Sequence, residues 1–167
     1  AHCPCLPVRV LRAVWLGGGK RDQLAVQRGV ACLKRTQEPD GSWAGRWGVN
    51  YVYGTFLALR GLEAAGENNR EAYILRAGEW LRSIQNADGG WGESCASYAQ
   101  NTYVAASSAP SQTAWAILGL LSSGDIICGN VPQGTEYFVE TPHPDAGRNT
   151  TFPTAPVCPG SFPPHLP

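Results

Sequence analysis

Two short stretches of this sequence share one pattern, and that pattern decides the fold. Residues 37–43 read QEPDGSW, and residues 85–91 read QNADGGW. Both stretches, here called Gln-to-Trp boxes, keep Gln, Asp, Gly and Trp in the same order, 48 residues apart. Internal repeats with a period of about 20 to 50 residues are typical of stacked supersecondary units. The sequence therefore predicts a repeat protein.

A helical pattern precedes each box. Apolar residues recur at helical spacing with charged residues between them, which predicts amphipathic helices. These positions are Val26, Val30 and Leu33 before the first box and Ile74, Ala77, Leu81 and Ile84 before the second. Pro39 in the first box and an Asp-Gly pair in both boxes should end the helices in a turn.

A nearly uncharged helical stretch follows each box. The stretch from Tyr53 to Ala65 carries only two charged residues, and the stretch from Ser111 to Leu121 carries none. A helix that is apolar on all sides is expected to be buried on all sides. Gly66 and Gly124 stand where helix C-caps belong, and Ser111 is a candidate N-cap.

These alternating helices predict an all-α fold. Charged helices form an outer layer and apolar helices an inner layer, as in a partial α/α barrel, or toroid, of helix–turn–helix repeats joined at the Gln-to-Trp boxes. Closing such a barrel needs more repeats than this chain has. We expect an irregular N-terminus over residues 1–7, partial barrel repeats over 8–125, and a degraded repeat with a Pro-rich tail over 126–167, which holds nine of the 13 Pro residues. The tail is expected to be disordered or translated from a shifted reading frame, and residues 1–7 are also expected to be out of frame; the alternative is a real, divergent terminus.

The composition excludes several classes of protein. The 13 basic and 13 acidic residues cancel, and only 16% of residues are charged, so no nucleic-acid partner is expected. No apolar run reaches the roughly 18 residues that a membrane span needs, so any membrane association would be peripheral. The six Cys residues lack the spacing of a zinc site and are expected to be free thiols.

The boxes are interpreted as structural rather than catalytic or metal-binding. A Gln side chain can bridge two helix ends, Gly allows a positive φ in the turn, and Trp covers the junction. The residues concerned are Gln37, Gly41, Trp43, Gln85, Gly89 and Trp91. The alternative is a non-catalytic helical repeat or a carbohydrate-binding module in which the exposed side chains of Trp43, Trp47 and Trp91 stack on sugar rings.

The boxes and their flanks also carry a family resemblance. Residues 37–55, where QEPDGSW is followed by GRWGVNYVYGT at 45–55, resemble the C-terminal half of squalene–hopene cyclases. Residues 85–93 resemble the next box of that family, and PSQTAWA at 110–116 resembles its following inner helix. The resemblance covers about residues 8–125. Residues 134–141 resemble the helix before another box, although Pro142 stands where Gln is expected.

The resemblance implies an isomerase of triterpenoid and hopanoid biosynthesis. Such a terpene cyclase converts squalene, its small apolar substrate, to hopene or hopanol: an acid protonates a terminal double bond, and a carbocation passes through ring closures in a dry, aromatic cavity. No metal or diffusible cofactor is implied. The intact enzyme is expected to be a bacterial, membrane-associated homodimer, peripheral on the cytoplasmic face. Trp47 matches an aromatic residue that lines the cavity, and Tyr53 matches one close to the catalytic acid.

One departure from the family pattern bears on activity. The family's catalytic acid lies in an Asp-x-Asp-Asp motif, and no Asp-x-Asp occurs in this sequence. Cys5 also stands where the family has an Asp that supports the acid. The expectation is therefore a cyclase fragment that is inactive alone. Another α/α-barrel isoprenoid enzyme, such as a protein prenyltransferase subunit, would need zinc ligands, and the sequence offers no convincing set.

Overall fold

The described residues of the computed structural model are 23–45, 49–125 and 129–140. They form six helices: α2 (Gln23–Thr36), α3 (Asn50–Ala65), α4 (Ala72–Ser83), α5 (Ala96–Gln100), α6 (Pro110–Ser122) and α7 (Asn130–Glu140). Within these ranges the only β-type pairing is an isolated bridge between Glu93 and Ala105, so the all-α expectation is confirmed for this part of the chain. None of the described helices is long and apolar enough to cross a membrane.

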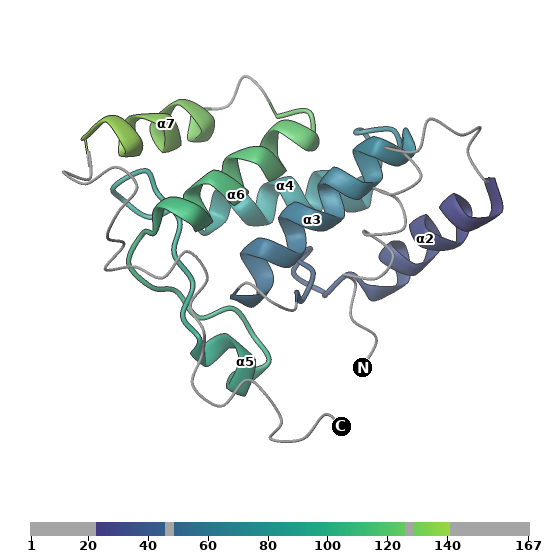
Figure 1. The fold of residues 1–167 in the computed structure, drawn as a ribbon, viewed down its shortest axis with the longest axis horizontal. Helices are drawn as coiled ribbons and strands as arrows, with labels where there is room; N and C mark the ends of the chain where they lie inside the picture. The colour runs from purple at the N-terminus through teal and green to yellow at the C-terminus, as the bar shows by residue number, and fades with distance from the viewer. Residues whose placement is uncertain (1–22, 46–48, 126–128, 141–167) are drawn as a thin grey trace, which may run out of the picture.

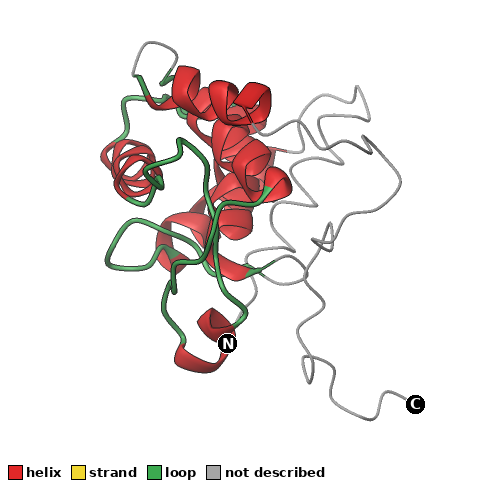
Figure 2. Ribbon diagram, turned by 90° about the vertical axis from the view of Figure 1, so that its left-hand side faces the viewer, coloured by secondary structure: helices red, strands yellow, loops and turns green. Residues whose placement is uncertain are grey.

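Two helices form the middle of the structure. α3 and α6 lie side by side, α4 packs on both of them, α2 packs on α3, and α7 packs on α6 (Figure 1). The side view in Figure 2 shows that helices and their connecting loops make up the whole described region. The chain thus alternates between flanking helices (α2, α4, α7) and inner helices (α3, α6), in the order that the two boxes predict.

The flanking helices bury the apolar faces expected of them. Six of the seven predicted positions are buried, namely Val26, Val30, Leu33, Ile74, Ala77 and Leu81. Ile84 lies one residue beyond the end of α4 and is partly buried. The prediction of amphipathic helices before the boxes is therefore confirmed.

The prediction that the inner helices are buried on all sides is wrong for α6. Leu120 is fully buried, but Leu118 and Leu121 are 41% and 39% exposed. An apolar helix is covered on every side only when neighbours pack on every side. Among the described residues no element covers this side of α6, so an apolar strip of the inner layer faces outward.

The predicted helix ends are right at the glycines and wrong at Ser111. Gly66 and Gly124 have φ of 75° and 84°, the left-handed conformation that glycine adopts without steric cost just beyond a helix. α6 instead begins at Pro110, after Ala109 in an extended conformation. Proline suits the first helical position because its φ is already helical. The N–H that proline lacks would have no partner within the helix at that position. Ser111 therefore lies inside the helix and does not cap it.

The cysteine expectation needs a correction. Cys32 carries a free thiol, as expected, but Cys95 is disulfide-bonded. Pairing depends on two Cα atoms lying within about 7 Å, which spacing along the chain does not reveal.

Two further expectations concern the ends of the chain. Residues 134–140, predicted to resemble a helix before a further box, are helical as part of α7. The predicted irregular segment 1–7, Pro142 and the rest of the tail beyond residue 140 lie outside the described residues.

Candidate functional site

The first Gln-to-Trp box joins two flanking helices through the side chain of Gln37. Its Nε2 donates hydrogen bonds to the carbonyl of Gly41 (2.8 Å) and to the carbonyl of Tyr73 at the start of α4 (2.7 Å). Its Oε1 accepts one from the guanidinium of Arg76 (2.8 Å). A single amide therefore links the turn after α2 to the first turn of the next flanking helix.

Trp43 joins the same turn to the inner layer. Its indole N–H donates to the carbonyl of Leu33 in α2 (2.9 Å), and its backbone N–H donates to Oγ1 of Thr55 in α3 (3.0 Å). Trp43 and Thr55 are both fully buried. Asp40 accepts bonds from the N–H and hydroxyl of Ser42 (2.9 and 2.7 Å), which closes the turn and places this carboxylate in a local structural role.

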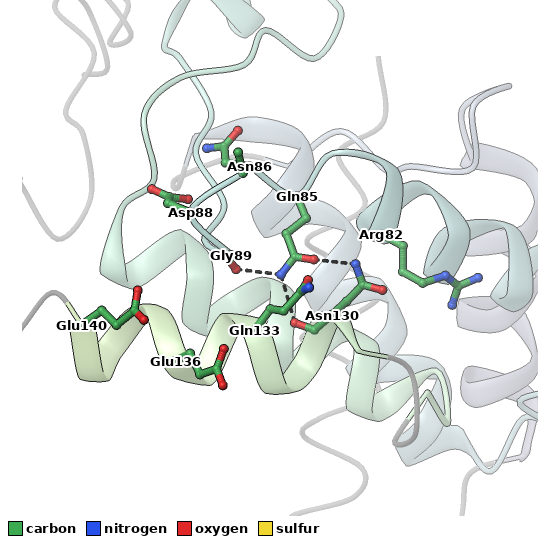
Figure 3. Close-up of a pocket in the computed structure, with 10 residues that line it drawn as sticks. Arg82, Gln85, Asn86, Asp88, Gly89, Asn130, Gln133, Glu136 and Glu140 are labelled. Carbon is green, nitrogen blue, oxygen red and sulfur yellow. Dashed lines mark hydrogen bonds between the residues drawn. The ribbon is translucent and has the colours of Figure 1, made fainter.

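The second box repeats these contacts between other helices. Gln85 donates to the carbonyls of Gly89 (2.7 Å) and Asn130 in α7 (3.0 Å), as Figure 3 shows. The indole of Trp91 donates to the carbonyl of Leu81 (2.7 Å), and its backbone N–H donates to Oγ1 of Thr113 (3.0 Å).

Neither box glycine could be replaced by a residue with a side chain without a steric clash. Gly41 and Gly89 have φ of 97° and 80°. A Cβ on Gly41 would lie 2.8 Å from the carbonyl oxygen of Arg76, and one on Gly89 would lie 2.5 Å from that of Gln133. Each glycine thus allows the turn and lets the next flanking helix approach it closely.

The exposed-Trp alternative fails at both boxes. Trp43 and Trp91 have no exposed surface, so neither can offer a ring face to a sugar. Trp47 lies outside the described residues, and nothing in the structure tests its predicted role.

Tyr53 lies in an aromatic cluster at the contact between the inner helices. It is half-buried in the first turns of α3, and its ring centroid lies 4.8 Å from that of Trp115 on α6 and 6.3 Å from that of Phe56. Trp115 precedes the exposed Leu118 by one helical turn. The cluster therefore lies beside the apolar strip that α6 leaves uncovered.

One buried acid escaped the sequence analysis. Glu93, two residues after the second box, is only 4% exposed, and its two carboxylate oxygens accept hydrogen bonds from the backbone N–H groups of Tyr51 (3.0 Å) and Val52 (2.9 Å). Desolvation raises its pKa from 4.5 to about 7, although these hydrogen bonds act in the opposite direction. Burial, and secondarily the charge of Glu93, raises the pKa of Tyr103 to about 12. No local sequence signal marks Glu93, because the N–H groups that its carboxylate binds lie 42 and 41 residues away.

A polar groove of about 460 Å³ lies between the second box and α7 (Figure 3). Its lining carries charges of both signs and several amides, from Arg82, Gln85, Asn86, Ala87, Asp88, Gly89, Asn130, Gln133, Glu136 and Glu140. Such a lining does not suit the apolar substrate that the family resemblance implies, so we keep the aromatic cluster around Tyr53 as the candidate site.

Comparison with known proteins places the chain in one family. The squalene-hopene cyclase C-terminal domain matches residues 3–163. A squalene–hopene cyclase of Bradyrhizobium diazoefficiens is 45% identical over 128 residues, covering 75% of this chain and 19% of the relative. A probable squalene–hopene cyclase of Sinorhizobium fredii is 50% identical over 116 residues (68% and 18%).

A plant relative extends the match. A dammaradiene synthase of Dryopteris crassirhizoma is 37% identical over 157 residues, covering 85% of this chain and 22% of that protein. The chain spans about a fifth of the length of the curated relatives it matches. With a family match over most of its length, the chain belongs to the squalene–hopene cyclase family.

Proposed function

We propose that this chain forms part of the cavity wall of a triterpene cyclase that converts squalene to hopene or hopanol. The observation that carries the proposal is the aromatic contact of Tyr53 with Trp115 beside the uncovered apolar strip of α6. A hydrocarbon substrate needs an apolar wall, and a carbocation needs electron-rich groups that do not attack it. Aromatic faces meet both needs.

The proposed reaction is an acid-initiated polycyclisation. An acid outside this chain protonates a terminal double bond of squalene, the cation moves through successive ring closures, and loss of a proton or capture of water ends the cascade. Tyr53 lies near the acid, and Trp47 lines the cavity. Because the sequence holds no Asp-x-Asp-Asp motif, the isolated chain does not begin the reaction.

The Gln-to-Trp boxes serve as structural joints in this proposal. Each Gln amide links a turn to the next flanking helix, and each buried Trp links the turn to an inner helix. Further repeats of the same kind would close an α/α barrel around the cavity that this apolar strip lines. The intact enzyme would be a bacterial homodimer, peripheral on the cytoplasmic face of the membrane, and take squalene from the bilayer.

A full-length chimera tests the proposal. In the Bradyrhizobium cyclase, the segment that aligns with 128 residues of this chain would be replaced by those residues. The products formed from squalene would then be measured by gas chromatography. We expect hopene from the chimera and none from the isolated chain above a no-protein control. A chimera that folds but forms no cyclised product, or hopene made by the isolated chain, would contradict the proposal.

A matched pair of variants tests the role of Tyr53 in that chimera. Tyr53→Phe should lower kcat about 100-fold, at the lower end of the losses typical of groups that assist proton transfer. Tyr73→Phe is the control. The hydroxyl of Tyr73 donates a hydrogen bond to Glu67 on the flanking side of the fold, so its removal should change kcat by no more than about 2-fold. Equal effects of the two variants would argue against a role for Tyr53 in the reaction.

A further inference from the structure

α3 begins without a cap from its own neighbourhood. Val49 precedes the helix and makes no side-chain cap bond, and Asn50 has a φ of 26°, which is unusual for a residue with a side chain. The first N–H groups of a helix have no partner within the helix. Here the carboxylate of Glu93 is the missing acceptor: one of its oxygens binds the N–H of Tyr51 and the other binds the N–H of Val52.

Glu93 is itself held firmly between two other elements. Its backbone N–H donates to Oε1 of Gln112 in α6 (2.7 Å), and Nε2 of Gln112 donates back to its carbonyl (3.2 Å). The nearby hydroxyl of Ser97 in α5 favours the charged carboxylate and so acts to lower its pKa. The acid is therefore fixed at the backbone by α6 and at the side chain by α3.

This contact does not belong to the joint that the two boxes share. Gly45 occupies the position after the first box that Glu93 occupies after the second, and it has no side chain. The joint around Trp43 forms without an acid there. Glu93 instead binds the first turn of α3. Tyr53 directly follows Val52 in that turn.

We propose that Glu93 is a positioning residue: its carboxylate fixes the first turn of α3 and so sets the orientation of Tyr53 toward Trp115 and the cavity. This inference rests on the proposed function for its effect on catalysis, but not for its effect on the helix. An anionic acceptor at a helix N-terminus is favoured by the helix dipole as well as by the two hydrogen bonds.

The substitution Glu93→Gln separates the two effects. A Gln side chain has the same shape but only one acceptor oxygen, so its NH2 group faces an N–H donor and one buried N–H loses its partner. In the full-length chimera we expect hydrogen exchange in the peptide spanning residues 49–57 to accelerate about 10-fold or more, while a peptide from α4 keeps its rate. We expect kcat per folded enzyme to fall about 10-fold with KM within about 2-fold, since the change misplaces a reacting-site group rather than weakening uniform binding.

Two further variants serve as controls. Glu79→Gln removes an exposed acid from α4 and should leave both exchange and kcat unchanged. Ser97→Ala keeps the acid but removes the nearby hydroxyl that favours its charged form, so it should produce smaller changes of the same kind, and it decides the question if Glu93→Gln does not fold.

The outcomes are distinct. Unchanged exchange at the start of α3 overturns the inference, and so does faster exchange with unchanged kcat per folded enzyme, which leaves Glu93 a merely structural cap. If the unsubstituted chimera folds but makes no product, the proposed function has failed. The exchange result then still supports or overturns the fixing of α3 by Glu93.

Discussion

The two Gln-to-Trp boxes build the same joint with different sequence lengths between its parts. In both, the Gln amide binds a box glycine and the next flanking helix, and the indole binds a carbonyl ten residues earlier. The backbone N–H of the Trp binds a threonine hydroxyl that lies 12 residues ahead at Trp43 but 22 residues ahead at Trp91. The joint therefore tolerates an insertion between the turn and the inner helix, because its contacts lie at the two ends of that segment.

The longer segment after the second box is where the repeats differ in chemistry. It contains α5, the Glu93–Ala105 bridge and Ser97, and it brings the Glu93 carboxylate to the start of α3. The shared contacts form the scaffold, and the contacts that distinguish one repeat from the other lie beside the candidate site. Measurements that compare the two boxes can break or sharpen this division.

The largest expected effect is at the two buried indoles. Trp43→Ala and Trp91→Ala should each lower the free energy of unfolding by about 3–5 kcal/mol, because each removes a fully buried ring and leaves a cavity. Urea unfolding followed by circular dichroism gives both values. Losses that differ by more than about 2 kcal/mol would show that the joints are not equivalent.

The next effect is a pH dependence that comes from Glu93 in the second repeat. Because the pKa of Glu93 is raised from 4.5 to about 7, the folded state binds its proton more tightly than the unfolded state does. The stability that this protonation contributes is fully present below pH 4.5 and is lost as pH rises to about 7, a change of roughly 3 kcal/mol at about 1.4 kcal/mol per pKa unit.

The free energy of unfolding in urea is measured at pH 4.5 and pH 8 for the unsubstituted chain and for Glu93→Gln. The contribution of Glu93 is the pH-dependent change that the unsubstituted chain shows and the variant lacks. Among the described residues, Glu67 also has a shifted pKa, but its pKa is lowered, so its contribution is lost only as pH falls below 4.5. Tyr51 and Tyr103 have raised pKa values and stay neutral throughout. A pH dependence that survives Glu93→Gln unchanged would contradict this assignment.

A smaller, paired effect is expected at the threonines. Thr55→Val and Thr113→Val keep the shape of the side chain but leave the buried N–H of Trp43 or Trp91 without its acceptor, which costs about 1–3 kcal/mol. Thr135→Val on the exposed side of α7 is the matched control and should change stability by less than about 0.5 kcal/mol. Thermal unfolding ranks the three variants, and a control as costly as the other two would refute the role of the buried hydroxyls.

The smallest effect is expected where the joints use different outer partners. Arg76 donates to Oε1 of Gln37 in the first joint, whereas Nδ2 of Asn130 donates to that atom of Gln85 in the second. The Arg76 contact is exposed, so Arg76→Ala should lower stability by no more than about 0.5 kcal/mol. Asn130→Ala acts at a partly buried contact and should cost about 1 kcal/mol. The reverse order would mean that the exposed contact holds the joint.

The sequence by itself determined the features that depend on neighbouring residues. Helical spacing of apolar residues identified α2 and α4, because residues three and four apart lie on one helix face. Gly66 and Gly124 marked helix ends, since glycine adopts a positive φ at little cost. The repeated order of Gln, Asp, Gly and Trp marked both turns, whose internal hydrogen bonds span no more than four residues.

Only the tertiary structure decided what depends on distant residues. The exposure of Leu118 follows from which helices surround α6, and the composition of α6 cannot report it. Glu93 meets the first turn of α3 from more than 40 residues away, and Trp115 meets Tyr53 from the next inner helix. These contacts require the flanking and inner helices to be packed together first, so no local pattern in the sequence could indicate them.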